Sequence, residues 1–371
     1  MARSDSEGSG ATIRDVAVQA GVALSSVSRV LSGHPDVSPA MRAKVEAAVA
    51  ELGYEPDLLA QSLRSGSTKT IGFVLRDISN PLFANIARAA EQELRRSGFS
   101  MLITSSDGHL DVEARNLALL RRRRVDGVIV SLVSEEAEST RAALAALQGP
   151  VVLLDREVSG LNAAAVHCDH YSGVLRATGE LLARGHRRIG LVTGSLAVRS
   201  SRERLRGYEA AFAAAGVPVD RSLVSLRSFE ADYAKAEVIR MFSRRSEPTA
   251  LITGGIASAS GALQALRQLR RAVGSDVALV TLDEWPMFDV LAPDLASVSR
   301  DSGEMGTAAA RLMLDMLDGA EPRTVVIDTH FTPRDSVGSV RKSSSAPRKA
   351  APRKAAPRKA TGAGKSVRTD A

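Results

Sequence analysis

The chain has 371 residues, of which 44% are hydrophobic, so it is long enough to bury the cores of two or three domains. The single cysteine, Cys168, excludes an intramolecular disulfide and is typical of a protein from a reducing compartment. The N-terminus lacks the apolar segment of a signal peptide, and no apolar run approaches the roughly 18 residues of a membrane-spanning helix. We therefore expect a soluble cytoplasmic protein rather than a secreted or membrane-spanning one.

The net charge of +7 is concentrated at the C-terminal end of the chain. From Arg341 onward there are ten lysines and arginines against Asp370, so residues 1–340 together carry −2. Residues 1–66 also carry −2, from six basic and eight acidic residues. Any nucleic-acid contact made by this first segment must therefore depend on well-placed single charges, helix N-termini and main-chain amides.

Residues 11–31 predict two short helices separated by a tight turn. Thr12 can cap the first helix and Asp15 completes a capping box, so this helix should begin at Ile13. Gly21 should end it, because glycine adopts the left-handed conformation of a C-terminal cap at little cost. With a second helix at about 24–31, this is the layout of a helix-turn-helix, whose second helix enters the major groove of DNA. A plain helical hairpin would show much of the same spacing.

A third helix should follow, with Ser38 as its cap and Pro39 at its first position. Apolar residues recur in it at helical spacing and predict a small three-helix core; they are Met41, Val45, Ala48, Val49 and Leu52. Gly53 should end this helix. Residues 57–63 can form one further helix, which is too short to be stable alone.

From Lys69 onward, strand-like and helical segments alternate. The predicted strands are 71–75, 99–104, 125–132, 151–155, 189–193, 250–253 and 277–282. The predicted helices are 82–97, 112–123, 136–148, 171–184, 202–215, 233–242, 259–269 and 304–317. This alternation predicts an α/β fold of parallel sheets with helices on both faces, and a ligand site beyond the carboxyl ends of the strands.

The final segment repeats APRKA three times, at 346–350, 351–355 and 356–360. Proline at every fifth residue opposes a stable helix, so residues 339–371 are predicted to form an extended, basic tail of low complexity. This tail resembles the basic tails of linker-histone-like bacterial proteins. The Ser/Gly-rich residues 1–10 are predicted to be disordered.

Two segments carry a resemblance to a known family, TIRDVAVQAGVALSSVSRVLSG from Thr12 and VSPAMRAKVEAAVAELGYEPDLLAQSLRSGSTKTIGFVL from Val37. The continuous stretch from Thr12 to Leu75 resembles the start of the lactose-repressor/galactose-repressor family of bacterial transcriptional regulators. Looser similarity extends to about Gly338. The resemblance implies an all-α helix-turn-helix headpiece and a two-lobed α/β effector domain similar to periplasmic sugar-binding proteins.

The resemblance also implies a domain division. We expect a DNA-binding domain at 11–56, a hinge helix at 57–67 that folds on DNA, and an effector-binding and dimerisation domain at 68–338. The two lobes of that last domain would comprise 68–160 with 298–320, and 161–297 with 321–338.

Four residues are expected on the outer face of the second helix, namely Leu24, Ser25, Ser28 and Arg29. Arg29 can make a bidentate contact to guanine, and Leu24 and Ser25 occupy positions that set operator preference in the family, so these three are the predicted base contacts. Thr12, Ser26 and Ser28 are predicted phosphate contacts. Ala23 departs from the family, in which a serine usually caps this helix and contacts phosphate.

The family's hinge helix inserts a leucine into the minor groove at the operator centre, which fits the general use of apolar wedges to kink DNA. Leu63 matches that leucine, Ala60 would pack beside it, and Arg64 would follow the DNA backbone, although a surface role for Arg64 is an equal alternative.

Five residues match effector-cleft positions of the family: Asn80, Phe83, Arg204, Asp283 and Trp285. Phe83 and Trp285 would stack against a ring, Arg204 would anchor a hydroxyl or carboxylate, and Asp283 would accept hydroxyl groups. Core packing is the alternative for Phe83, whereas an arginine on the inward face would otherwise be buried unpaired. Asp155 and Asp169 are weaker candidates. Sugar-binding relatives usually carry Asn-Asp where this chain has Gly255 and Ile256, so we expect an effector other than an ordinary sugar, or a weak response.

No enzyme signature is convincing. Gly364-Lys365-Ser366 resembles the end of a phosphate-binding loop, but Lys359 stands where that motif requires glycine. Cys168 and the six histidines have no metal-ligand spacing, and we expect no cofactor or metal. His186 is interpreted as structural.

These observations predict a DNA-binding transcriptional regulator, most often a repressor in this family, that acts at the nucleoid. A homodimer, or alternatively a tetramer, would bind a pseudo-palindromic operator in double-stranded DNA and respond to a sugar or sugar-like metabolite. A nucleoid-associated DNA-binding protein that relies on its tail, with a vestigial cleft, is the alternative. A solute-binding protein is disfavoured by the lack of an export signal.

Overall fold

The computed structural model describes residues 11–31, 34–54, 66–244, 247–292 and 294–339. The expectations for residues 1–10, for hinge positions 57–65 and for the tail from 340 onward lie outside these ranges. Among the described helices, none has both the length and the apolar character needed to span a bilayer.

The headpiece has three helices, α1 (Ile13–Ala20), α2 (Leu24–Leu31) and α3 (Pro39–Leu52). The capping box predicted for α1 is present, since the Thr12 side chain accepts from the Asp15 amide and the Asp15 carboxylate accepts from the Thr12 amide. Gly21 ends α1 with φ 64°, and Gly53 ends α3 with φ 57°, both in the left-handed region. The predicted bounds of all three helices are confirmed.

One valine from each headpiece helix is fully buried, and these three side chains form the centre of its core: Val16 of α1, Val27 of α2 and Val45 of α3. Val30 and Ala48 complete the buried set with Ala17. Because Val27 and Val30 point inward, α2 presents its remaining positions to solvent.

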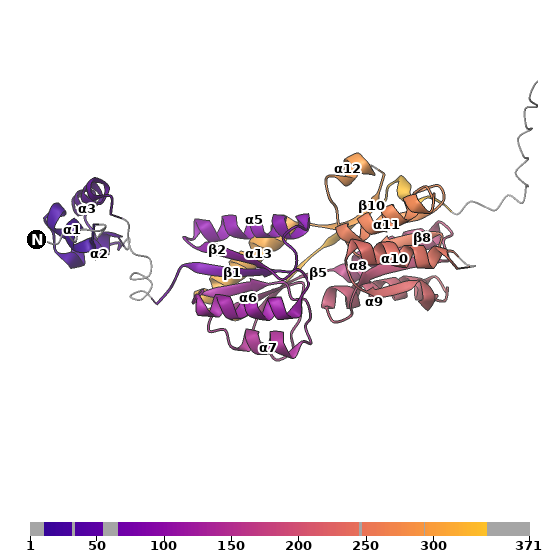
Figure 1. Ribbon diagram of the computed structural model, residues 1–371, viewed down its shortest axis with the longest axis horizontal. Helices are drawn as coiled ribbons and strands as arrows, with labels where there is room; N and C mark the ends of the chain where they lie inside the picture. Colours follow the sequence, from indigo (N-terminus) through magenta and orange to yellow (C-terminus); the bar gives the residue numbers. More distant parts are fainter. Residues whose placement is uncertain (1–10, 32–33, 55–65, 245–246, 293, 340–371) are drawn as a thin grey trace, which may run out of the picture.

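Two six-stranded sheets form the rest of the described chain, each in its own lobe (Figure 1). The first sheet has the order β11-β5-β4-β3-β1-β2, and its strand pairs are parallel. Its strands are β1 (Thr70–Leu75), β2 (Ser100–Ser105), β3 (Gly127–Val130), β4 (Val151–Leu154), β5 (Ala164–Cys168) and β11 (Thr324–Ile327).

The second sheet has the order β12-β10-β9-β8-β6-β7, and only β12 runs antiparallel to its neighbour among the described strands. Its strands are β6 (Ile189–Gly194), β7 (Val224–Arg227), β8 (Ala250–Thr253), β9 (Ala278–Thr281), β10 (Ala296–Arg300) and β12 (Thr329–Thr332). The short turns η1 (Arg221–Leu223) and η2 (Asp335–Val337) lie beside it.

Helices cover both sheets, as the alternation predicted (Figure 1). Those of the first lobe are α5 (Pro81–Arg96), α6 (Leu110–Arg122), α7 (Glu138–Ala145) and α13 (Ser302–Leu317). Those of the second lobe are α8 (His170–Ala183), α9 (Arg199–Ala214), α10 (Ala231–Phe242), α11 (Ile256–Gln268) and α12 (Phe288–Leu291).

The predicted lobe boundaries differ from the observed sheets. Strands β5 and β11 pair with each other and with β4, so both belong to the first lobe, whereas the prediction placed 161–297 and 321–338 in the second. Strand β10 belongs to the second sheet, although 298–320 was predicted for the first lobe. The chain therefore crosses between lobes after β5, after β10 and between β11 and β12. These strands are short, and none of them was predicted from the sequence.

Close helix packing fixes the elements that reach the space between the lobes. A Cβ atom on Gly207 of α9 would lie 2.4 Å from the carbonyl oxygen of Tyr171 in α8, and one on Gly306 of α13 would lie 2.2 Å from the carbonyl of Ile86 in α5. Both glycines therefore allow a backbone approach that any side chain would prevent. Arg204 on α9 and Met305 on α13 are held in place by these contacts.

Candidate functional site

The exposed face of α2 carries the side chains that were predicted to contact bases. Leu24 is 44% exposed, Ser25 and Arg29 are exposed, and Ser28 is half-buried. Leucine side chains of this size are usually buried, so an exposed Leu24 beside Ser25 and Arg29 fits a surface that waits for a partner. The adjacent α1 adds Val18, which is 82% exposed.

The predicted phosphate contacts lie at the edges of this face. Ser26 and Ser28 are half-buried on α2. Thr12 is exposed, but its hydroxyl group also donates to Asp15 Oδ2 at 2.7 Å as part of the cap of α1. At the start of α2, the Ala23 carbonyl accepts from the amide of Ser26 at 2.9 Å, and alanine has no side-chain group that could cap this helix. Ala60, Leu63 and Arg64 lie outside the described residues.

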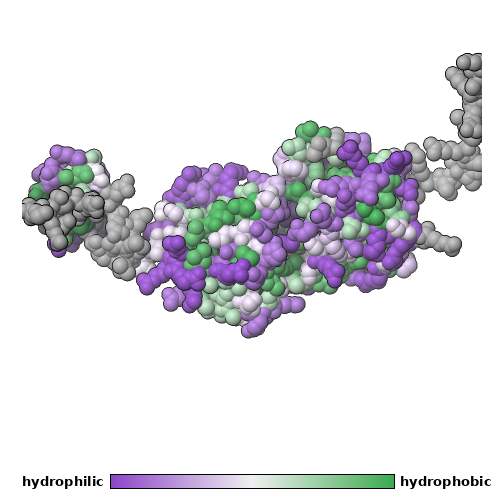
Figure 2. All heavy atoms as spheres, in the orientation of Figure 1, coloured by the Kyte–Doolittle hydropathy of each residue, from purple (hydrophilic) through white to green (hydrophobic). Residues whose placement is uncertain are grey.

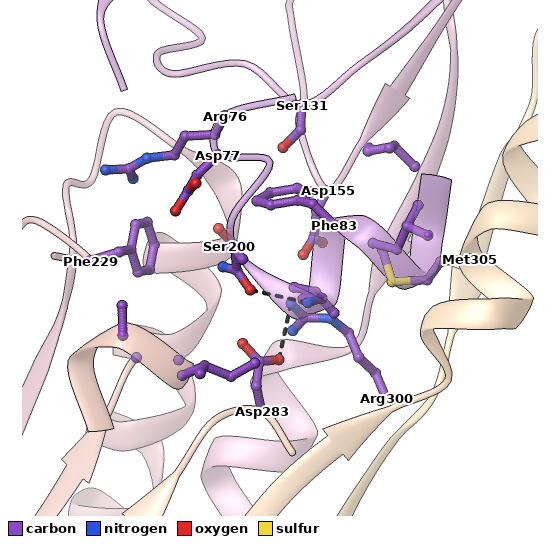
Figure 3. A pocket seen from close by; sticks show the side chains of 18 of the residues that line it. Arg76, Asp77, Phe83, Ser131, Asp155, Ser200, Phe229, Asp283, Arg300 and Met305 are labelled. Carbon is purple, nitrogen blue, oxygen red and sulfur yellow. Dashed lines mark hydrogen bonds and ion pairs between the residues drawn. The ribbon is translucent and has the colours of Figure 1, made fainter. Parts of the chain in front are cut away.

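A second site lies between the lobes, where the carboxyl ends of the two parallel sheets face each other (Figure 3). Arg76 and Asp77 follow β1, Ser131 follows β3 and Asp155 follows β4. From the second lobe come Ser200, Arg204, Phe229, Gly255, Asp283 and Arg300. A cleft at this edge is the location that the open α/β fold predicts.

Asn80, Phe83, Arg204 and Asp283 all line this cleft, as predicted from the sequence. Asn80 also caps α5, since its Oδ1 accepts from the Leu82 amide at 3.1 Å. The half-buried ring of Phe83 packs on the first core and lies beside Asp155 in Figure 3. The two interpretations of Phe83, core packing and cleft wall, therefore describe the same side chain.

Trp285 does not line the main cleft. It borders a smaller cavity of about 120 Å³ on the far side of Asp283, and its ring meets the ring of Phe288 edge-on, with centroids 5.5 Å apart. Asp169 is also outside the cleft, because its carboxylate caps α8 by accepting from the Ser172 amide at 3.0 Å. The weaker candidate Asp155 does line the cleft.

Asp155 is held by two donors from its own lobe boundary. Its Oδ2 lies 2.6 Å from His170 Nε2, and its Oδ1 accepts from the Cys168 amide at 3.0 Å. Burial lowers the pKa of His170 to about 4, so its imidazole is neutral near pH 7 and Nε2–H donates to the carboxylate. Burial alone would raise the pKa of Asp155, but His170 and Arg300 hold it well below its usual value.

Two buried arginines form the floor of the cleft. Arg204 is 3% exposed, and its Nη1 donates to the carbonyl of Gly254 at 2.8 Å. Arg300 Nη2 lies 3.1 Å from Asp283 Oδ1 in an ion pair whose side chains are each 7% exposed. Burial raises the pKa of Asp283, while the same carboxylate outweighs the effect of burial on Arg300 and raises the pKa of its guanidinium.

Arg76 and Phe229 were missed by the sequence reasoning. The Arg76 guanidinium lies 5.3 Å from the Phe229 ring centroid and pairs with Glu230 at 2.7 Å, so it joins the first lobe to the second across the cleft. Arg204 lies over the same ring at 5.5 Å. Arg76 could have been found from its place directly after a buried strand, whereas Phe229 and Arg300 adjoin strands β7 and β10, which were not predicted.

Comparisons with known proteins agree with this arrangement. Residues 12–57 match the family described as bacterial regulatory proteins, lacI family, and residues 178–337 match a periplasmic binding protein-like domain. The ribose operon repressor of Escherichia coli strain K12 is 32% identical over 305 residues, which cover 82% of this chain and 92% of the repressor. The transcriptional repressor PurR of Proteus mirabilis is 30% identical, over 86% of this chain and 94% of PurR.

Solved structures show the same architecture. The complex of the transcriptional regulator CelR with cellobiose has a TM-score of 0.67 at 30% identity and covers 88% of this chain and 99% of CelR. The Lac repressor dimer bound to operator and an anti-inducer has a TM-score of 0.77 at 24% identity, over 89% of this chain and 100% of that one, and supports the fold alone.

Proposed function

Because the chain belongs to the lacI family of bacterial regulatory proteins, we propose that it is a repressor in which α2 reads an operator and the interlobe cleft binds a small-molecule effector. Its curated relatives are transcriptional repressors rather than enzymes. The observation that carries the proposal is the joint presence of an exposed recognition face on α2 and a polar cleft between two lobes.

At the DNA, we propose that Arg29 contacts a guanine, that Leu24 and Ser25 contact neighbouring bases, and that Thr12, Ser26 and Ser28 contact phosphates. Ala60, Leu63 and Arg64 are proposed for the minor groove. Since Ala23 offers no hydroxyl group, the contact that a serine would make at the start of α2 is absent. The hold on DNA then depends more strongly on a second headpiece.

We propose a homodimer that binds a pseudo-palindrome. The first sheet ends in edge strand β2, where Leu102 and Ile103 are 36% and 38% exposed. Figure 2 shows this apolar surface of the first lobe between more hydrophilic regions. An apolar strip at a sheet edge is more stable when a second chain covers it, which supports dimerisation. As its partner would be chromosomal DNA, we place the protein in the cytoplasm.

In the cleft, we propose Asn80, Phe83, Arg204 and Asp283 as effector contacts, with Trp285 reached only by a ligand that extends into the neighbouring cavity. An effector that prefers one relative position of the lobes changes the equilibrium between DNA-binding and non-binding states by its difference in affinity. Arg76 and Glu230, one from each lobe, are placed to respond to that change.

The Arg29→Ala variant tests the proposed reading of DNA. We expect the loss of about 1–3 kcal/mol of preference per half-site for a DNA sequence selected by the protein over random DNA, because a bidentate guanine contact is lost. Binding is measured by fluorescence anisotropy on both DNAs. Lys44→Ala, which removes an exposed charge from α3, is the control and should leave the preference unchanged.

Deleting residues 341–371 separates this reading from the nucleoid-associated alternative. The deletion should weaken binding to both DNAs and reduce its salt dependence, because it removes only charge contacts to phosphate. If Arg29→Ala instead weakened selected and random DNA equally, the tail-dependent, non-specific alternative would be favoured.

A further inference from the structure

The connection from β8 to α11 exposes main-chain donors at the floor of the cleft. Strand β8 ends at Thr253, Gly254 and Gly255 follow, and α11 begins at Ile256. Gly255 has φ 151° and ψ −176°, a conformation that is essentially restricted to glycine and is common where a backbone approaches a ligand. Gly254, Gly255, Ile256 and Ala257 all line the cleft.

The N-terminus of α11 has no side-chain cap. This helix has 13 residues, so its first amides carry the partial positive charge of a full macrodipole and lack acceptors within the helix. An uncapped helix N-terminus that opens on a cleft, preceded by glycines, is a general arrangement for binding phosphate or carboxylate groups.

Two buried guanidinium groups provide an independent observation at the same place. Arg204 and Arg300 line the cleft beside this turn, and their Nε atoms are buried without a hydrogen-bond partner. Arg204 donates to the carbonyl of Gly254, which places its guanidinium directly at the glycine turn. Burial, and then the nearby charge of Arg300, lower the pKa of Arg204 to about 10, so the two cations repel each other.

The carboxylates on the cleft floor do not compensate both arginines. Asp283 pairs with Arg300, and both oxygens of Asp155 are already engaged by His170 and the Cys168 amide. Residues 255 and 256, glycine and isoleucine, offer a sugar hydroxyl no polar side chain. A neutral sugar would therefore leave the guanidinium groups and the α11 amides with few strong acceptors.

We infer that the effector is an anion whose carboxylate or phosphate group lies against the N-terminus of α11, between Arg204 and Arg300. This inference rests on the proposed role of the cleft as the effector site and names the chemical class of the effector. The rest of the molecule, near Phe83 and Phe229, is a small polar ring or chain.

Matched pairs of small molecules test the class. Binding of D-ribose, D-ribonate and D-ribose 5-phosphate to the full-length protein is measured by isothermal titration calorimetry. We expect at least one of the two anions to bind ten or more times more tightly than D-ribose. A carboxylate is favoured if ribonate shows the preference, and a phosphate if ribose 5-phosphate shows it. Equal or tighter binding of D-ribose, or no binding by either anion, overturns the inference.

The Ala257→Asp variant tests the location. An aspartate in the first turn stabilises a helix, so the variant should fold, but its carboxylate would occupy or repel the proposed anion position. We expect at least a tenfold loss of affinity for the preferred anion and an unchanged affinity for D-ribose. Ala257→Asn, which is nearly the same size and neutral, is the control and should retain most of the anion binding. Equal losses in both variants would contradict the assignment.

These outcomes are separable from those of the proposed function. Tight binding of D-ribose alone would remove the anionic class and leave the effector cleft in place. The Arg29→Ala experiment tests operator recognition without any effector, so its result does not depend on the choice of small molecule.

Discussion

Glu113 is a buried acid in the first lobe, behind the cleft. Its carboxylate accepts from the Val133 amide at 2.7 Å and from the Thr140 hydroxyl at 2.9 Å, and the side chain is fully buried. Burial raises its pKa in spite of these hydrogen bonds. Between the unfolded and the raised folded pKa, the folded protein binds more protons, so this group lowers stability as the pH rises through that window.

The Glu113→Gln variant should therefore be more stable than the parent protein at pH 7, by on the order of 1 kcal/mol, the scale of one pKa unit. A glutamine can still accept from Val133 and bond to Thr140. The free energy of unfolding is measured in urea at pH 7 and at pH 4.5, and the advantage should shrink at the lower pH. Glu136→Gln, at an exposed neighbouring position, should change neither value. A less stable Glu113→Gln protein at pH 7 would show that the ionised acid is favourable.

Single residues also show how far the site could be predicted from the sequence. Arg204 and Asp283 were placed correctly in the cleft, because each belongs to a motif with a fixed position relative to a predicted helix or strand. Trp285 was placed in the main cleft two residues beyond Asp283, yet its ring turns to Phe288 in the next cavity. The direction of a side chain in a loop depends on packing that a one-dimensional pattern does not contain.

The lobes are joined by elements of unequal strength. On one side, Glu135 is 4% exposed and accepts from the amide of Arg199 at 2.7 Å at the start of α9, which no side chain of its own lobe caps. It also pairs with Arg202 at 2.7 Å. On the other side, Glu230 pairs with Arg76, but the Glu230 side chain is 62% exposed.

Burial decides which of the two contacts matters more. Glu135→Ala should lower the free energy of unfolding by about 1.5–3 kcal/mol, because charged hydrogen bonds to a helix N-terminus are lost. Glu230→Ala should cost less than about 1 kcal/mol, since exposed ion pairs are weak. Urea unfolding gives these values, and small-angle scattering reports whether the lobes separate. A larger effect of Glu230→Ala would reverse this ranking.

At the scale of elements, the long strands and helices were predicted well and the short strands were missed. Residues 71–75 and 250–253 are apolar throughout, as expected for strands buried on both faces, and both predictions were confirmed within one residue. Strand β5 contains Ala164, Ala165 and His167, and β11 is partly exposed, so neither has the composition of a central strand. Their pairing depends on chain segments more than 150 residues apart, and the lobe boundaries were wrong for that reason.

The whole molecule combines a headpiece without excess positive charge with a cleft that joins two lobes. Residues 1–66 carry −2, so a single headpiece has little non-specific attraction to phosphate and should bind weakly by itself. Two headpieces on a dimer add their contacts, provided that the lobes hold them at the spacing of two half-sites. The effector cleft controls DNA binding only through this spacing.

The most direct test of this account is the DNA sequence that the full-length protein selects from a random-sequence library. The account predicts an inverted repeat of two half-sites, each with a guanine whose enrichment disappears when Arg29→Ala protein is used for the selection. No enriched sequence, or a single half-site without its inverted partner, would contradict the central claim of a dimeric, sequence-specific repressor.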